Sequence, residues 1–189
     1  QMLITDNHEF GSALAEQQFK TCHNMTDRLA ALTALVHHAS LQAAPCLEIF
    51  YAQYKNNELA LDKWFAIQAT VPPRQNFALV DHILQLKQHP AFKINNPNRV
   101  RSLIHAFCLN NPAGFHDEQG RGYRFWIECV KELNTINPQV AARLARGLDR
   151  WKKFASPFQE MMHSTLAELA QKNLSSDVAE IIHKALSTD

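Results

Sequence analysis

The sequence of 189 residues predicts an all-α fold, in which about ten helices pack as antiparallel pairs in a curved, solenoid-like array. Apolar residues recur at helical spacing in most segments, and no alternating strand pattern interrupts them. The loops between these segments are short, which favours antiparallel neighbours. We therefore expect one helical domain over residues 1–189, and the start at Gln1-Met2 suggests a piece excised from a longer protein.

The first third of the chain contains one weak helical pattern followed by three strong ones. Residues 1–23 predict a lead-in helix after a polar loop rich in turn formers. Residues 24–38 place their leucines on one face, which is typical of a helix packed on a core. Pro45 can open the next helix, because its fixed φ suits a first turn. A further helix over 59–71 ends at the two prolines that follow, which remove hydrogen-bond donors.

The middle of the chain carries two apolar stripes. The stripe in residues 75–88 consists of Phe77, Val80, Ile83 and Leu84. Asn96 can then cap a helix that begins at Pro97, where the missing N–H of proline has no intrahelical partner to lose. The core residues of this second helix follow the i, i+3, i+4, i+7 spacing and are Val100, Leu103, Ile104 and Phe107.

Arg101 and His105 fall on one flank of that second stripe, whereas Arg99 falls on the opposite flank. The two arginines therefore cannot point the same way. For Arg143 and Arg146, as for these two, the ordinary interpretation is solvent exposure or structural ion pairing.

The last third continues with helices that proline or serine can start. Asn111-Pro112 opens a short turn or helix, and Asn137-Pro138 opens a helix over 138–154 in which Arg143 and Arg146 lie off the apolar face. The remaining predicted starts are Ser156-Pro157 and Ser175.

Composition and cysteine usage exclude several classes of protein. The net charge of +1 gives no broad positive field for nucleic acid or an anionic membrane, so neither is an expected partner. No apolar run is long enough for a membrane span and no signal peptide is visible. The cysteines lack any C-x-x-C pair, which indicates reduced structural thiols in the cytoplasm. They are Cys22, Cys46, Cys108 and Cys129.

Catalytic and metal motifs are weak throughout the sequence. His8-Glu9 is followed by Ser12 where a zinc peptidase needs a second histidine, so that site cannot form. The Glu-x-x-His pairs of di-iron bundles occur at Glu160 and Glu180, but the helical wheel turns both pairs away from the apolar face. The Gly-Arg-Gly at 120–122 predicts a turn rather than a phosphate cradle, and Cys108 and Cys129 lack an activating base. We expect no catalytic and no metal-binding residue in this chain.

Several segments together resemble the C-terminal helical domain of the bacterial aminopeptidase N family, which are zinc metallopeptidases of the M1 type. The resemblance spans most of the chain in family order and is closest from Asn24 to Leu144. It rests on NMTDRLAALTALV, LALDKWFAIQATVP, NPNRVRSLIHAF, NPAGFHDEQGRGY, LNTINPQVAARL and NLSSD.

This resemblance implies a function for the chain as part of a larger hydrolase. The intact protease would remove N-terminal residues from peptides with a zinc ion bound outside this fragment, and the isolated fragment should be inactive. The helical domain would cover the catalytic domain of the same polypeptide and help to enclose the substrate cavity. Arg101, Gln139 and Arg143 would face that cavity near the carboxyl-terminal side of the peptide substrate.

Two other functions stay open from the sequence alone. A free-standing helical scaffold could bind a protein or peptide on its concave face, as helical solenoids do. A di-iron enzyme is the more distant alternative, because its Glu-x-x-His pairs would have to point inward.

Overall fold

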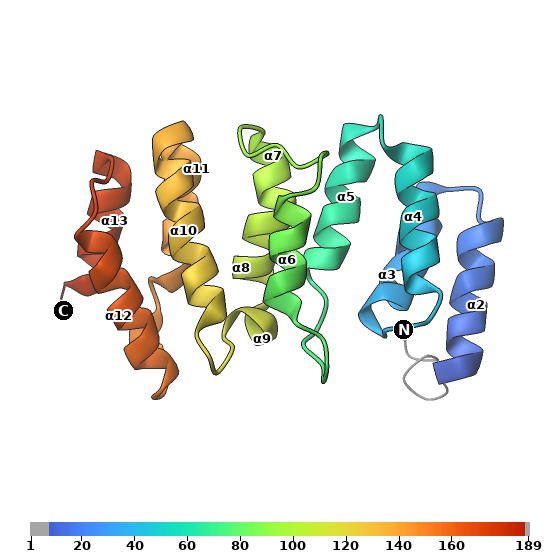
Figure 1. The fold of residues 1–189 in the computed structure, drawn as a ribbon, viewed down its shortest axis with the longest axis horizontal. Coiled ribbons are helices and arrows are strands. Elements are labelled where there is room, and N and C mark those ends of the chain that lie inside the picture. The colour runs from blue at the N-terminus through green and yellow to red at the C-terminus, as the bar shows by residue number, and fades with distance from the viewer. Residues whose placement is uncertain (1–7, 188–189) are drawn as a thin grey trace. The chain divides into compact units, whose positions relative to one another are not determined.

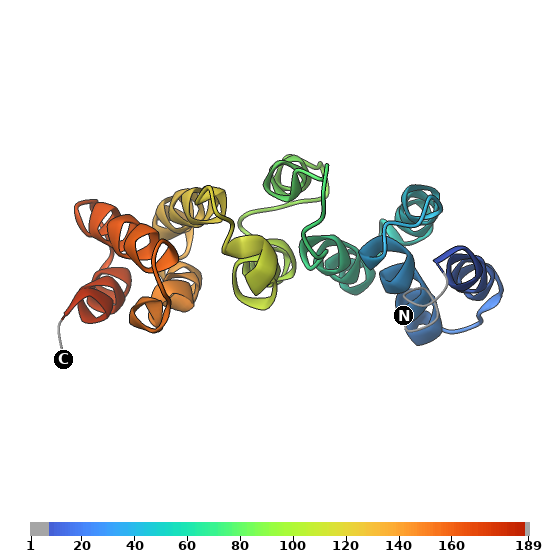
Figure 2. The same ribbon diagram turned by 90° about the horizontal axis from the view of Figure 1, so that it is seen from below.

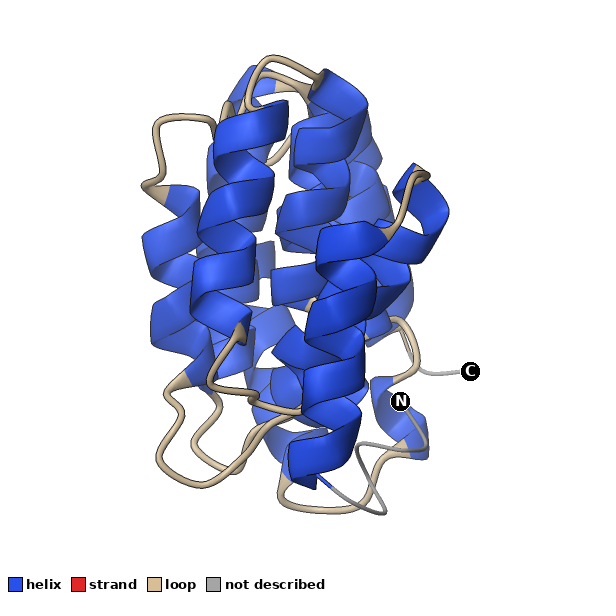
Figure 3. Ribbon diagram, turned by 90° about the vertical axis from the view of Figure 1, so that its right-hand side faces the viewer, coloured by secondary structure: helices blue, strands red, loops and turns tan. Residues whose placement is uncertain are grey.

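The computed structural model describes residues 8–187, and every regular element in that range is a helix (Figure 3). The predicted all-α class is therefore confirmed. Contacts divide the chain into two compact units, Gln1–Pro72 and Pro73–Asp189. The single domain over 1–189 stays a prediction. No helix among the described residues is both long and apolar enough to span a membrane.

The described part of the first unit is a small helical cluster centred on α3. Its helices are α2 (His8–Thr21), α3 (Met25–His37), α4 (Ala43–Tyr54) and α5 (Glu58–Ala69) (Figure 1). Helix α3 packs against each of the other three. The predicted lead-in helix is thus present as α2, while residues 1–7 lie outside the described residues.

Helix α3 in the first unit begins where its capping residue predicts, whereas helix α4 begins earlier than predicted. The Asn24 side chain accepts the backbone N–H of Asp27 at 2.8 Å, which caps α3 as its position predicts. Helix α4 begins at Ala43, two residues before the predicted Pro45, with no side-chain cap. Proline is tolerated there because the first four N–H groups of a helix have no intrahelical partner.

The second unit contains the remaining helices. They are α6 (Leu79–Lys87), α7 (Pro97–Val100), the π-helical turn η1 (Arg101–His105), α8 (Ala106–Asn110), α9 (Pro112–Phe115), α10 (Arg121–Ile136), α11 (Pro138–Ala145), the 3₁₀ turns η2 (Arg146–Leu148) and η3 (Trp151–Lys153), α12 (Phe158–Ala170) and α13 (Ser176–Leu186). Within this unit α10 and α12 lie in one row and α11 and α13 in a second, with contacts along and between the rows (Figure 2).

All three Asn-Pro helix starts are confirmed by capping hydrogen bonds. Asn96, Asn111 and Asn137 each accept backbone N–H groups of the first helical turn, and proline follows at the first helical position. Asn137 also ends α10, so α10 and α11 are joined by one residue. Ser175 precedes α13 as predicted, but its side chain makes no capping hydrogen bond.

The predicted stripe of the helix after Asn96 forms the centre of the second unit's core. All four of its residues are fully buried: Val100, Leu103, Ile104 and Phe107. Trp126 on α10 is also fully buried, and its indole N–H donates to the carbonyl oxygen of Leu144 on α11 at 2.8 Å. This bond satisfies the one polar group of the largest buried side chain.

Two predicted details of the second unit are wrong. In residues 75–88 the helix begins only at Leu79, because Asn76 takes a positive φ of 57° and turns the chain before it. Leu84, a member of the predicted stripe, is 43% exposed, and Leu86 is buried instead. The predicted helix over 138–154 ends at Ala145, and the chain continues through the two 3₁₀ turns.

Candidate functional site

Arg101 and His105 are the first and last residues of a π-helical turn inside the continuous helix over 97–110. The sequence predicts an α-helix here, since the apolar spacing does not reveal the wider turn. Single π turns within α-helices occur frequently at functional sites. The turn therefore draws attention to the two polar side chains that bound it.

The two arginines of this helix have different environments, as the helical wheel predicts. Arg99 is only 1% exposed and belongs to the core, so solvent exposure, one of the two ordinary interpretations, is wrong for it. Arg101 is exposed, and its guanidinium donates to the side-chain oxygen of Asn98 at 3.3 Å. Of the two arginines, Arg101 is thus the one available to a ligand.

His105 is half-buried between Arg101 and helix α11. Burial lowers its pKa first, and the positive charges of Arg101 and Arg143 lower it further, while the backbone of Val140 acts in the opposite direction. The imidazole is accordingly neutral at pH 7. Because Arg101 and Arg143 act on the same ring from two helices, the fold brings these two predicted residues to one region.

Gln139 and Arg143 line a hollow of about 360 Å³ between α11 and α13. Arg146 lies on the same wall, and Asp177 and Glu180 face it from α13. Among the described residues no ion pair joins these arginines to the two carboxylates. The formal charges of the hollow cancel, so it is suited to a ligand that carries both signs of charge.

The sequence did not indicate that α13 would complete this hollow. Asp177 and Glu180 lie about forty positions after Gln139 and Arg143 and share no motif with them. Only the packing of α13 on α11 places the four side chains together. The acidic residues three apart on α13 were the one available signal, since they share a face of that helix.

The glycine loop before α10 is a turn, as predicted, and a carboxylate binds its backbone. The carboxylate of Asp117 accepts the backbone N–H groups of Gln119 at 3.0 Å and Gly122 at 2.7 Å. Gly120 takes a left-handed φ of 66°. The N–H groups that would cradle a phosphate are thus already bound to a carboxylate of the chain itself.

The weak metal motifs occupy solvent-facing positions. The side chains of both Glu-x-x-His pairs are exposed: Glu160, His163, Glu180 and His183. His8 is hydrogen-bonded through Nε2 to the carbonyl oxygen of His38 at 2.8 Å. No group of three or more potential metal ligands lies together within residues 8–187.

The four cysteines are free thiols, and three of them are buried as predicted. Burial raises the pKa of Cys129 to about 12 and that of Cys108 well above its ordinary value. Both are therefore protonated and non-nucleophilic near neutral pH.

Comparison with known proteins agrees with the predicted resemblance. A family model described as "Domain of unknown function (DUF3458_C) ARM repeats" matches residues 1–187. Aminopeptidase N of Escherichia coli (strain K12) is 43% identical over 179 residues, which make up 92% of this chain and 20% of that protein. Aminopeptidase N of Haemophilus influenzae is 41% identical over 177 residues, or 93% of this chain and 20% of that protein.

A solved structure matches the fold as well. The crystal structure of Legionella pneumophila aminopeptidase A in complex with aspartic acid matches with a TM-score of 0.90 and 32% identity, covering 97% of this chain and 21% of that chain. This chain therefore spans about a fifth of the length of the relatives it matches. ARM repeats are stacked helical repeats, in agreement with the predicted solenoid-like array.

Proposed function

The chain belongs to the DUF3458_C family of ARM-repeat domains, and from this premise we propose that it is a non-catalytic helical domain of a zinc-dependent aminopeptidase. In this role it covers the catalytic domain of the same polypeptide and helps to enclose the substrate cavity. The observation that carries the proposal is the 41–43% identity to aminopeptidase N over more than nine-tenths of the chain, against one-fifth of each relative.

The chemistry of the intact enzyme is proposed to reside outside this chain. The enzyme would release N-terminal residues from peptides, and zinc would supply an activated water for that hydrolysis. The side chains described here do not fit a zinc site, because no three potential ligands converge. We also propose a cytoplasmic location, which is supported by the four free thiols.

Arg101, Gln139 and Arg143 are proposed to contact the carboxyl-terminal side of the peptide. Arg101 and Arg143 are both exposed, and both lower the pKa of His105. The neutral imidazole of His105 adds no further positive charge between the two guanidinium groups. A peptide carboxylate could bind at either guanidinium. Asp177 and Glu180 oppose this attraction within the Arg143 hollow, so we expect a modest electrostatic contribution.

The test uses the full-length enzyme and two substrates that differ only in a free or amidated carboxyl terminus. Arg143→Ala should raise KM for the free peptide by roughly fivefold, because an exposed charge pair contributes at most about 1 kcal/mol. The KM for the amidated peptide should stay nearly unchanged. Arg150→Ala, which removes an exposed arginine outside the hollow, should affect neither. Equal effects of Arg143→Ala on both substrates would contradict the contact with the carboxylate.

A separate assay tests the division of labour. The isolated 189-residue chain, supplied with zinc, should not hydrolyse an aminoacyl anilide. Robust zinc-dependent hydrolysis by this chain would overturn the proposal of a non-catalytic domain.

A further inference from the structure

A second hollow, of about 290 Å³, lies between α6 and α10 in the second unit. Its size is just below the usual range for small-molecule sites, roughly 300–1,000 Å³, so it suits a small ligand. It shares no lining residue with the hollow that contains Gln139 and Arg143. Neither the sequence motifs nor the proposed function assigns it a ligand.

The floor of this hollow is apolar. Val80, Phe125 and Cys129 are 7%, 5% and 1% exposed, and they form its inner surface. Burial raises the pKa of the Cys129 thiol to about 12, so the sulfur is an uncharged wall at neutral pH. Leu84, which is 43% exposed, adds a large apolar side chain at the edge.

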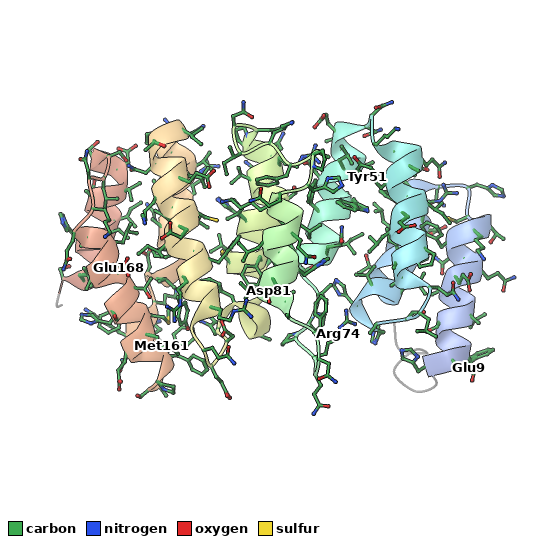
Figure 4. The ribbon with its side chains drawn as sticks, viewed as in Figure 1. Glu9, Tyr51, Arg74, Asp81, Met161 and Glu168 are labelled. Carbon is green, nitrogen blue, oxygen red and sulfur yellow. The ribbon has the colours of Figure 1, made fainter. Side chains whose placement is uncertain are left out.

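Charged side chains surround this floor, and most of them are paired. Lys87 Nζ lies 2.5 Å from Glu132 Oε2, and Lys131 Nζ lies 2.9 Å from Glu128 Oε1. Arg121 pairs with Asp81, which Figure 4 marks in the first turn of α6. These pairs leave the two basic lining residues Lys87 and Arg121 with their charges matched.

Arg124 is the exception on this rim. It lines the hollow from α10 and is exposed, and within residues 8–187 it makes no ion pair. Glu128, one turn further along α10, is the one carboxylate among the described residues that line this hollow, and it is paired with Lys131. One unmatched guanidinium therefore stands at the mouth of an apolar pocket. A guanidinium is geometrically suited to a carboxylate, which it can bind through two parallel hydrogen bonds.

We infer that this hollow binds a carboxylate carried on a small apolar body. The apolar body lies against Val80, Leu84 and Phe125, and the carboxylate lies at Arg124. Two sources share this chemistry, namely a free aromatic or branched aliphatic acid and the carboxyl-terminal residue of a peptide. This inference does not depend on the proposed function, since it uses only the surfaces of α6 and α10.

The experiment follows the methyl NMR signals of Val80 and Leu84 in the 189-residue chain during titration with phenylacetate. We expect saturable shifts with a Kd of about 1 mM, typical of a ligand with about ten non-hydrogen atoms. Phenylacetamide, which lacks the charge, should bind at least fivefold more weakly, and phenethylamine should not bind. Absence of saturable shifts, or equal binding of acid and amide, would overturn the inference.

Two variants separate the charge from the apolar floor. Arg124→Gln should weaken phenylacetate about fivefold and leave phenylacetamide unchanged, whereas Arg150→Gln should change neither. Leu84→Asn should weaken both ligands, and its exposed position leaves the core intact. An Arg124→Gln variant with unchanged affinity for phenylacetate would refute the role of the arginine.

The two sources are distinguished by comparing phenylacetate with N-acetyl-L-phenylalanine, which carries a peptide bond beside the carboxylate. Tighter binding of N-acetyl-L-phenylalanine supports a peptide carboxyl terminus as the ligand. Tighter binding of phenylacetate supports a free acid.

Discussion

Replacing Gly122 with alanine should strongly destabilise the second unit. A Cβ atom at this position would lie 2.0 Å from the carbonyl oxygen of Phe115 and 2.9 Å from its carbonyl carbon. Both atoms belong to backbone, so side-chain rotation cannot relieve the contact. To reach even 3.0 Å, the start of α10 and the end of α9 must separate by about 1 Å, a scale at which packed interiors resist change.

The expected loss in free energy of unfolding combines two effects. Overpacking against backbone costs typically 1–3 kcal/mol, with larger losses on record. The same displacement disturbs the 2.7 Å hydrogen bond from the Gly122 N–H, at the start of α10, to the Asp117 carboxylate. Losing a side-chain acceptor of such a helix-start N–H costs roughly 1 kcal/mol. We therefore expect a loss of about 3 kcal/mol, which for a chain of this size lowers Tm by about 6–12 °C.

Gly147→Ala is the matched control. There the nearest atom is Leu109 Cδ2 at 2.9 Å, the end of a flexible side chain that is itself 41% exposed. Its loss should stay near or below about 1 kcal/mol, because Leu109 can move aside and the next atom, Nε1 of the buried Trp126 at 3.3 Å, must give way by only a few tenths of an ångström. Urea unfolding followed by circular dichroism measures both variants. Similar losses for the two glycines would refute the argument that backbone contact sets the penalty.

Three further results are expected. Asn137→Ala should lower the free energy of unfolding by about 1 kcal/mol, measured in urea, because it removes the side-chain oxygen that accepts the N–H of Val140. Ser175→Ala should change this free energy little, since the Ser175 hydroxyl makes no capping hydrogen bond. A larger loss for Ser175→Ala than for Asn137→Ala would contradict this reasoning. At pH 8 a thiol reagent should modify one cysteine quickly, Cys22, and the other three only on unfolding; mass spectrometry that locates rapid modification at a buried cysteine would exclude this protection. Burial lowers the pKa of His82, and the charge of Arg74 lowers it further, so the unfolded chain takes up the proton at a higher pH than the folded chain does. The stability that is present above the unfolded pKa of about 6.5 is therefore lost as the pH falls toward the folded pKa. His82→Gln should reduce the difference between the free energies of unfolding measured at pH 7 and at pH 5.

Local signals made much of the fold predictable. The Asn-Pro starts were correct because the capping asparagine and the following proline act within one helical turn. The helical wheel also separated Arg99 from Arg101 correctly, since that separation needs only the rotation per residue. The all-α class follows from the same short-range periodicity.

Features that depend on distant segments were not predictable. Leu84 satisfied the apolar spacing, yet it is 43% exposed and Leu86 is buried, because the elements packed around α6 decide which part of its apolar surface faces the core. The meeting of His105 with Arg143 requires helix α11 to cross beside the π turn. Asp177 and Glu180 enter the Gln139 hollow only because α13 packs on α11.

The π turn at Arg101–His105 also makes this point of the helix over 97–110 tolerant of a change in chain length. A π turn holds about one residue more than an α-helical turn over nearly the same rotation, so deleting one residue there would restore α-helical geometry. The segments on either side would keep their present faces, with Val100 and Phe107 in the core. A deletion in the regular helix after the turn would instead rotate the preceding segment by about 100° and take Arg99 out of the core. Related chains that lack one residue in this helix should therefore have lost it within the turn.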